Sequence, residues 1–264
     1  MGLIALASIK GSPGVTTTAV ALASVWPGTE RVLVAEVDPC GGDLAARFSR
    51  PLEPGLISLA AASRRSTGAA LLLEHCQQIL GELDVLLGPA RSDRAEAALR
   101  VLGERGLWRE LGNSEEQVLA DCGRLDAQSA AVAVVEASAL LLLVARPVLS
   151  ELQHVHARLP SLRRVGQRVA LLLVGNGPYQ SREVSETLDV EVAGMLPDDK
   201  HAAGVLHGEP GSSRALARLP LLRSASALVD DFMKPRESAQ IAEPLIEGRA
   251  GQPSAIALLA EGAP

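Results

Sequence analysis

The sequence predicts an α/β fold, with a mostly parallel β-sheet flanked by helices on both faces. Short aliphatic runs alternate with segments of helical periodicity, which is typical of βαβ units with right-handed crossovers. The hydrophobic fraction is 47%, and aromatic residues make up only 2%. A core of Leu, Val, Ile and Ala suits strands that are covered on both faces, because such strands read as continuous aliphatic runs. The 264 residues suffice for one large domain of this kind.

The first unit is a strand, a glycine-containing loop and a helix. Residues 3–9 are an apolar run that predicts a buried strand, and residues 16–25 predict a helix that begins where the glycines stop. The N–H groups in the first turn of such a helix lack intrahelical partners, so they and the helix dipole favour an anion in the loop. Phosphate is the anion that this layout suggests. For the loop taken alone, a plain strand-to-helix turn is the alternative.

The later elements follow in the same alternating order. Residues 31–39 predict a second strand that ends in Asp38 and Pro39, and residues 83–87 predict a third. An amphipathic helix is expected over 93–111, a strand over 117–123 that contains Asp121, and a helix over 126–136. Next come a strand over 139–145, a helix over 148–164, a strand over 169–174 and a strand with its turn over 192–198.

Chemically distinctive residues follow the ends of these strands. Because ligands of parallel α/β sheets bind beyond the carboxyl ends of the strands, residues at these positions should meet along one rim. Residues scattered through a core would show no such relation to strand ends. The pattern therefore favours a binding site over a set of unrelated structural positions. Its members are Lys10, Asp38, Asp121, Asn176 and Pro197.

The first loop resembles the deviant Walker A motif of the ParA/MinD family, whose pattern is Lys-Gly-Gly-x-Gly-Lys-Thr-Thr. The segments around Asp38, Asp121 and Asn176, and the Gly-Met-Leu-Pro-Asp run that ends at Asp198, resemble later blocks of that family in order and spacing. The resemblance extends over about residues 1–234 and implies a P-loop NTPase (SIMIBI-like) fold. Five loop residues fit the pattern, namely Lys10, Gly11, Gly14, Thr16 and Thr17, whereas Ser12, Pro13 and Val15 depart from it or are unusual.

The resemblance implies ATP or ADP as ligand, with Mg²⁺. In the family, the first loop lysine, here Lys10, reaches across a homodimer to the partner's phosphates, and the aspartate at Asp38 orients the attacking water. These two residues are the catalytic candidates. The magnesium candidates are Thr16, Asp38 and Asp121. The nucleotide-binding candidates are Gly11, Ser12, Gly14, Val15, Thr16, Thr17, Asn176, Pro197 and Asp198.

Val15 occupies the position of the lysine that reaches the β- and γ-phosphates in P-loops. Two functions therefore stay open. One is an ATP-dependent dimerisation switch with weak or slow hydrolysis, which positions a partner in chromosome or plasmid partitioning, at the division site, or in pilus or secretion machinery. The other is a pseudo-ATPase scaffold without productive nucleotide chemistry. The CpaE-like pilus-assembly branch tolerates degenerate loops, and so it is a plausible relative.

Other features limit the remaining possibilities. The net charge of −6 argues against a broadly basic surface, although local arginines (Arg163, Arg164 and Arg168, or Arg214, Arg218 and Arg223) leave non-specific DNA binding open as a minor alternative. We expect a cytoplasmic protein, since no run reaches the length of a membrane span and no signal peptide is evident. Residues 235–264, rich in Ala, Gly, Pro and Glu, predict a flexible tail that lacks a basic amphipathic membrane helix.

Overall fold

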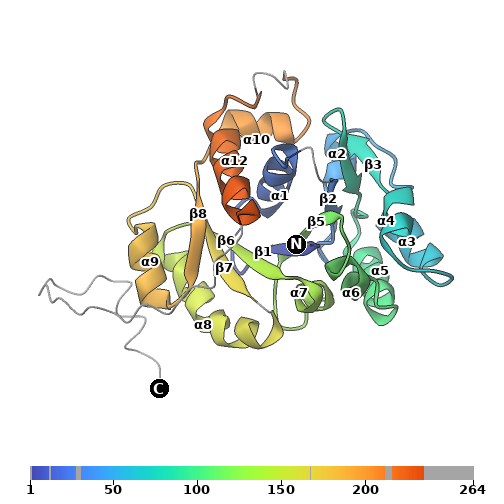
Figure 1. Cartoon of the computed structure of the whole chain (residues 1–264), viewed down its shortest axis with the longest axis horizontal. Helices are drawn as coiled ribbons and strands as arrows, with labels where there is room; N and C mark the ends of the chain where they lie inside the picture. The colour runs from blue at the N-terminus through green and yellow to red at the C-terminus, as the bar shows by residue number, and fades with distance from the viewer. Residues whose placement is uncertain (1, 12, 28–30, 167, 212–215, 235–264) are drawn as a thin grey trace, which may run out of the picture.

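The computed structural model describes residues 2–11, 13–27, 31–166, 168–211 and 216–234. They form an eight-stranded sheet with the order β3-β4-β2-β5-β1-β6-β7-β8 (Figure 1). Neighbouring strands pair in parallel except at one edge, where β3 runs antiparallel to β4. The strands are β1 (Leu3–Ser8), β2 (Val32–Glu36), β3 (Gln77–Ile79), β4 (Leu83–Leu86), β5 (Gln117–Arg124), β6 (Leu140–Ala145), β7 (Val169–Val174) and β8 (Glu191–Leu196).

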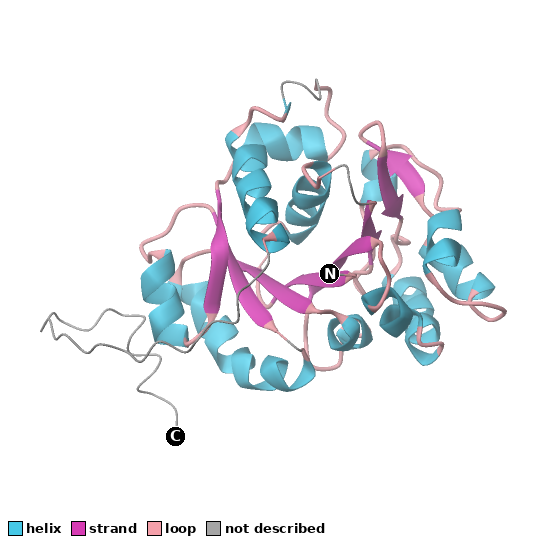
Figure 2. Ribbon diagram, in the orientation of Figure 1, coloured by secondary structure: helices cyan, strands magenta, loops and turns pink. Residues whose placement is uncertain are grey.

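Helices cover both faces of this sheet (Figure 2). On one face lie α1 (Val15–Ser24), α2 (Leu44–Arg47), α10 (Lys200–Leu206) and α12 (Pro220–Met233). On the other lie α3 (Leu56–Ala62), α4 (Ala69–Glu74), α5 (Ser92–Glu104), α6 (Leu107–Gly112), α7 (Val132–Ala137), α8 (Leu149–Val165) and α9 (Ser181–Leu188). The predicted fold class is therefore confirmed.

The central strand β1 shows why the sheet needs cover on both sides. Leu3 and Ala5 belong to the core beneath α5 to α8, whereas Ile4 and Leu6 belong to the core beneath α1 and α12. Successive side chains of a strand point to opposite faces, so an uninterrupted aliphatic run supplies both cores. Because β1 and its neighbour β5 are buried in the middle of the sheet, the loops that follow them have a rigid base.

Two predicted helices differ from the structure. The helix expected over 93–111 is divided into α5 and α6, because Gly106 adopts a left-handed conformation with φ 75° that interrupts the helix. The prediction of a helix over 126–136 is wrong in its first half, because the helix in this region, α7, begins only at Val132. There the side chains of Asp126 and Ser129 accept hydrogen bonds from the backbone N–H groups of Gln128 and Ala131, which stabilises turns instead of helix.

The predicted domain over 1–234 coincides with the part of the chain that contains the described residues, and its boundary stays a prediction. The tail predicted for 235–264 lies outside the described residues, as does Ser12 of the loop. Within the described part of the chain, every helix is too short or too polar to cross a membrane.

Candidate functional site

The loop between β1 and α1 has the backbone geometry of an anion cradle. Gly11 and Gly14 have φ values of 75° and 92°, a left-handed conformation that favours glycine. Gly14 is the N-cap of α1, and its carbonyl accepts the hydrogen bond from Thr18 N at 2.8 Å. The preceding N–H groups of the first turn remain directed into the loop, where the helix dipole also favours negative charge.

Val15, the first residue of α1, supplies no charge to this cradle. Its side chain is 7% exposed and packs into the core that α1 shares with α12. It also borders the hollow in front of the loop. A lysine at this position would have its stem against the core and its ammonium in the hollow. The structure therefore has room for the lysine side chain at this position, but Val15 supplies no positive charge there.

Asp121 is buried within β5, where it pairs with Leu6 of β1 shortly before the loop. Burial raises the pKa of Asp121 to about 7, a hydrogen bond with the Thr16 side chain opposes this rise, and the negative charge of Glu36 adds to it. Asp121 Oδ1 also accepts a hydrogen bond from Gly123 N at 3.0 Å. The structure thus brings two of the magnesium candidates, Thr16 and Asp121, into direct contact.

Asp38, the third magnesium candidate, lies across from this pair. Its Oδ1 accepts a hydrogen bond from Cys40 N at 2.8 Å, and burial raises the pKa of the Asp38 carboxyl above its ordinary value. A Cβ on Gly123 would lie 1.9 Å from Asp38 Oδ2, so glycine at that position lets the carboxylate approach β5. Asp38 and Thr16 border the same hollow.

These three residues fit a magnesium ion that is shared with phosphate. Among the described residues, no cluster of three or more His, Cys, Asp and Glu side chains could hold a metal by itself. Mg²⁺ in nucleotide sites commonly takes one or two protein oxygens, keeps several waters and completes its octahedron with phosphate oxygens. The Thr16 hydroxyl and the two carboxylates match that partial set of donors.

Glu36 is a buried carboxylate that the sequence analysis missed. It is 2% exposed and accepts hydrogen bonds from three backbone N–H groups: Asp43 at 2.6 Å, Leu44 at 3.0 Å and Gly88 at 2.9 Å. Burial raises its pKa above the ordinary value, although these hydrogen bonds oppose the rise. Glu36 therefore fixes the start of α2 to the end of β2. A carboxylate at the end of an apolar strand was the only sequence signal for this role.

Two hollows meet at the loop. The first, of about 520 Å³, is bordered by the loop residues Gly11, Gly14, Val15, Thr16 and Thr17 and, across from them, by Asp38, Asp43, Arg47 and His207. The second, of about 160 Å³, is bordered by Pro13, Thr18, Arg146, Pro197, Asp198 and Asp199. Both hollows include Gly14 and Thr17, so a ligand could pass its phosphates over the loop and place its nucleoside in the second.

The second hollow contains an acceptor without a partner. Asp199 Oδ1 caps α10 by accepting from Ala202 N at 3.0 Å, while Asp199 Oδ2 is buried and has no hydrogen-bond partner among the described residues. A ribose hydroxyl or an exocyclic amino group could donate to it. Pro197 and Asp198 border the second hollow, whereas Asn176 is exposed and borders an adjoining hollow, beside Tyr179 and Met195, that shares Gly175 with the second.

Lys10 is exposed and points away from the first hollow toward α8. Its Nζ lies 2.9 Å from His154 Nε2, and it does not border the hollow next to its own loop. Nearby on α8, the buried Glu151 accepts hydrogen bonds from Arg146 N at 2.8 Å and Arg146 Nη1 at 3.3 Å. A Cβ on Gly11 would lie 3.3 Å from Glu151 Oε1, so α8 packs closely against the loop.

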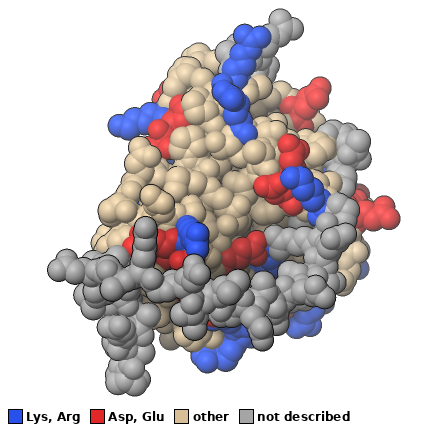
Figure 3. All heavy atoms as spheres, turned by 60° about the vertical axis from the view of Figure 1, so that its left-hand side comes forward, with Lys and Arg blue, Asp and Glu red and all other residues tan. Residues whose placement is uncertain are grey.

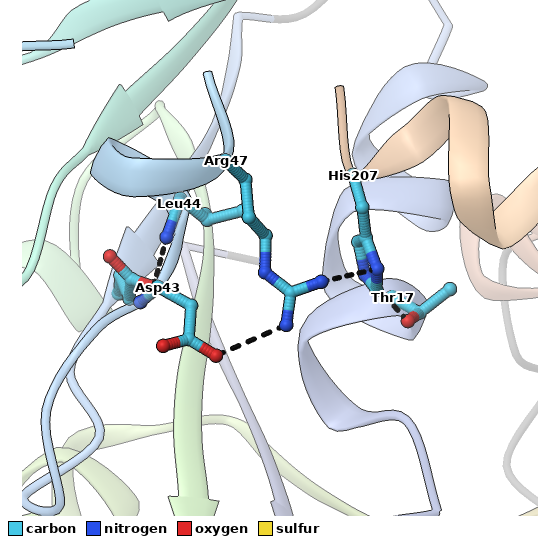
Figure 4. Close-up of polar contacts among 6 residues, drawn as sticks. Thr17, Asp43, Leu44, Arg47 and His207 are labelled. Atoms are coloured by element: carbon cyan, nitrogen blue, oxygen red, sulfur yellow. Dashed lines mark hydrogen bonds and ion pairs between the residues drawn. The ribbon is translucent and has the colours of Figure 1, made fainter. Parts of the chain in front are cut away.

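Arg47 is the cation that the fold brings in from the opposite side. It lies at the end of α2, where Nη2 donates to Asp43 Oδ2 at 3.1 Å and Nη1 donates to His207 Nδ1 (Figure 4). His207 follows α10, and its Nε2 lies 2.9 Å from Thr17 Oγ1. Burial and, to a smaller extent, the charge of Arg47 lower the pKa of His207 to about 4. No sequence motif marks Arg47 or His207, which lie 160 positions apart.

Two of the arginines considered for DNA binding are already paired. Arg163 is paired with Asp189, and Arg168 with Glu191. Several basic side chains on the face shown in Figure 3 likewise lie beside acidic ones. Arg214 lies outside the described residues. Each of these two arginines therefore lies beside an acidic side chain and is not part of a purely basic patch.

Several solved structures have the same fold as this chain. No protein-family model matches the sequence, and no curated protein compared with it is similar enough to count as a relative. A Pyrococcus furiosus cell division ATPase MinD superposes with a TM-score of 0.70 at 20% identity, covering 88% of this chain and 98% of that one. The Pyrococcus horikoshii septum site-determining protein MinD, in complex with Mg-ADP, gives 0.69 at 19% identity and covers 88% and 96%.

A ParA family ATPase from Chlorobium tepidum gives a TM-score of 0.68 at 19% identity, covering 86% of this chain and 96% of that one. Similarity at this level of identity concerns the course of the backbone. The agreement extends over nearly the whole length of each of these structures. The chain therefore has the fold of the ParA/MinD type of P-loop NTPase.

Proposed function

We propose that this chain binds MgATP or MgADP in the two joined hollows and acts as a nucleotide-dependent switch. One observation carries the proposal: the loop between β1 and α1 keeps the left-handed glycines of a phosphate cradle, with Thr16, Asp38 and Asp121 beside it. The P. horikoshii MinD structure contains Mg-ADP, which supports the same class of ligand. The loop would hold the nucleotide's phosphates, and Thr16, Asp38 and Asp121 would hold the magnesium ion.

The switch that we propose is a homodimer whose formation depends on ATP and whose hydrolysis is weak or slow. Loop amides and Mg²⁺ bind phosphate in the ground state, but phosphoryl transfer depends on positive charge around the γ-phosphate. Val15 removes one such charge, so hydrolysis suffers more than binding. The dimer positions or organises a protein partner in the cytoplasm, and Lys10, exposed at the start of the loop, reaches the phosphates of the facing chain.

The second candidate is a pseudo-ATPase scaffold, and the burial of Val15 favours it. An aliphatic side chain that packs into the core and also borders the hollow makes the loop less attractive to phosphate. Under this alternative, the fold and its partner surfaces are kept and nucleotide plays no part.

Calorimetric titration with MgATP and MgADP separates the two candidates. The switch predicts a dissociation constant in the micromolar to millimolar range for both nucleotides. Gly14→Val is the matched negative control, since a β-branched residue cannot readily adopt the φ of 92° at that position. Absence of both heat and thermal stabilisation at millimolar nucleotide would leave the scaffold as the function.

A further inference from the structure

The first hollow lacks the P-loop lysine and yet contains a cation from another element. Arg47 borders the hollow together with Gly14, Thr16 and Thr17, and 34% of its side chain is exposed. Its base is fixed, because Glu36 holds the N–H groups of Asp43 and Leu44 at the start of α2. The guanidinium is therefore presented to the hollow by a short, anchored helix.

The donor and the acceptor can be assigned in each of the two hydrogen bonds of His207. A guanidinium has donors only, so His207 Nδ1 must accept from Arg47 Nη1. A neutral imidazole then carries its proton on Nε2, which donates to Thr17 Oγ1. The lowered pKa of His207 agrees with the neutral form. As a result, the Thr17 hydroxyl keeps its own proton free to donate to a ligand.

The contacts from Thr17 through His207 to Arg47 place a hydrogen-bond donor at each end, and both donors face the loop. Thr17 offers an O–H from α1, and Arg47 offers N–H groups from α2 (Figure 4). The carboxylate of Asp43 also borders the hollow and is paired with Arg47 at 3.1 Å. Asp43 is 72% exposed, and exposed pairs of this kind contribute little, so a polyphosphate can compete for the guanidinium.

We propose that Arg47 replaces the missing P-loop lysine as the side-chain cation that binds the polyphosphate, and that His207 positions it. The inference rests on the proposed nucleotide site. A guanidinium suits this task because its planar fork can bind two phosphate oxygens at once. Arg47 is the binding residue, whereas His207 acts through Arg47 and through Thr17.

The test compares MgATP affinity, by calorimetry, in the wild type, Arg47→Ala and Arg47→Gln. Hydrogen bonds to charged groups are worth about tenfold to a hundredfold in affinity, so each variant should bind MgATP at least about tenfold more weakly. Arg50→Ala is the matched control, because Arg50 is exposed, lies three residues further on and borders neither hollow. It should bind like the wild type.

Val15→Lys distinguishes a direct contact from a structural effect. If Arg47 replaces the lysine, Arg47→Ala should cost much less in the Val15→Lys background than in the wild type, since the new ammonium binds the same phosphates. A structural role would lower affinity equally in both backgrounds and would overturn the proposal. His207→Ala should weaken MgATP several-fold in the wild type and have a smaller effect in Arg47→Ala, where only the contact of His207 with Thr17 is left to lose.

The outcomes separate this inference from the proposed function. A wild type that binds MgATP, with Arg47→Ala and Arg47→Gln equal to it, would overturn the role of Arg47 and leave the nucleotide site intact. Loss of binding in Arg124→Ala alone would assign the charge to Arg124, which borders the same hollow, and would also overturn it. A wild type that binds neither nucleotide would overturn both proposals.

Discussion

At the scale of single residues, Val15 decides how strongly the loop can bind phosphate. We expect Val15→Lys to tighten MgATP about tenfold, since a hydrogen bond to a charged group contributes roughly 1.5 to 3 kcal/mol. The hollow of about 520 Å³ in front of Val15 has room for the ammonium. Val15→Leu is the control, because it extends the side chain without charge. An unchanged affinity in calorimetry would mean that the loop is misshapen, with Pro13 as the suspect.

Asp121 should make the magnesium-free protein less stable as the pH rises. Its folded-state pKa of about 7 lies above the ordinary value of 3.8, so the folded state holds a proton that the unfolded state releases. The stability that this group contributes is therefore complete below about pH 4 and is lost as the pH rises toward 7, by roughly 4 kcal/mol in all. Urea unfolding in EDTA, from pH 5 to pH 8, measures the decline.

Asp121→Asn removes the titrating group and should flatten that profile between pH 5 and pH 8. Glu36 and Asp38, whose pKa values are also raised by burial, contribute with the same sign and leave a smaller residual slope. A steep decline that persists unchanged in Asp121→Asn would assign the pH dependence to those neighbours.

At the scale of elements, the contact of Glu36 with α2 determines where Arg47 lies. Glu36→Ala would leave the N–H groups of Asp43, Leu44 and Gly88 without their acceptor, at a cost on the order of 3 kcal/mol in unfolding free energy. Gly42→Ala should act similarly, because its Cβ would lie 2.2 Å from Glu36 Oε2. Urea unfolding at pH 7 measures both changes.

Glu82→Ala, at an exposed glutamate outside this contact, is the matched control and should change stability by less than about 0.5 kcal/mol. Wild-type stability in both Glu36→Ala and Gly42→Ala would contradict the anchoring of α2. Cleavage of α2 by a protease in these variants, with the rest of the chain protected, would locate the loss in this element.

The elements also show what a sequence can and cannot predict. β1, β6 and β7 were predicted within about one residue of their ends, because buried aliphatic runs in a parallel sheet have few alternatives, whereas β2 ends at Glu36, before the predicted Asp38 and Pro39. The break at Gly106 depends on one left-handed residue, which the helical periodicity around it conceals. The short α2 has too little periodicity to stand out, and its cation was therefore overlooked.

At the scale of the whole molecule, the order of the strands decides which of the residues predicted to share one rim lie in contact. Thr16, Asp38 and Asp121 come together, because β1, β2 and β5 are neighbours in the sheet. Asn176 follows β7, two strands from β1, and lies in a hollow that adjoins the second one through Gly175. The contact of Arg47 with His207 joins segments from opposite ends of the chain. Only the folded arrangement reveals such a pairing.

The last prediction concerns the assembly of two chains. Lys10 is exposed at the start of the loop and contacts His154 on α8, so within one chain it lies outside the hollow next to its own loop. In the proposed switch, this lysine reaches the phosphates of a facing copy. Lys10→Ala should therefore abolish dimerisation by MgATP in analytical ultracentrifugation, while the thermal stability of the monomer stays within about 0.5 kcal/mol of the wild type.

Lys234→Ala is the matched control, since Lys234 is exposed, paired with Asp231 and placed at the end of α12. It should dimerise with MgATP like the wild type. A Lys10→Ala protein that still forms dimers with MgATP would show that Lys10 does not cross the interface. A wild type that dimerises equally without nucleotide would show that the phosphates do not control assembly, because a switch requires the ligand to bind the dimer more tightly than the monomer.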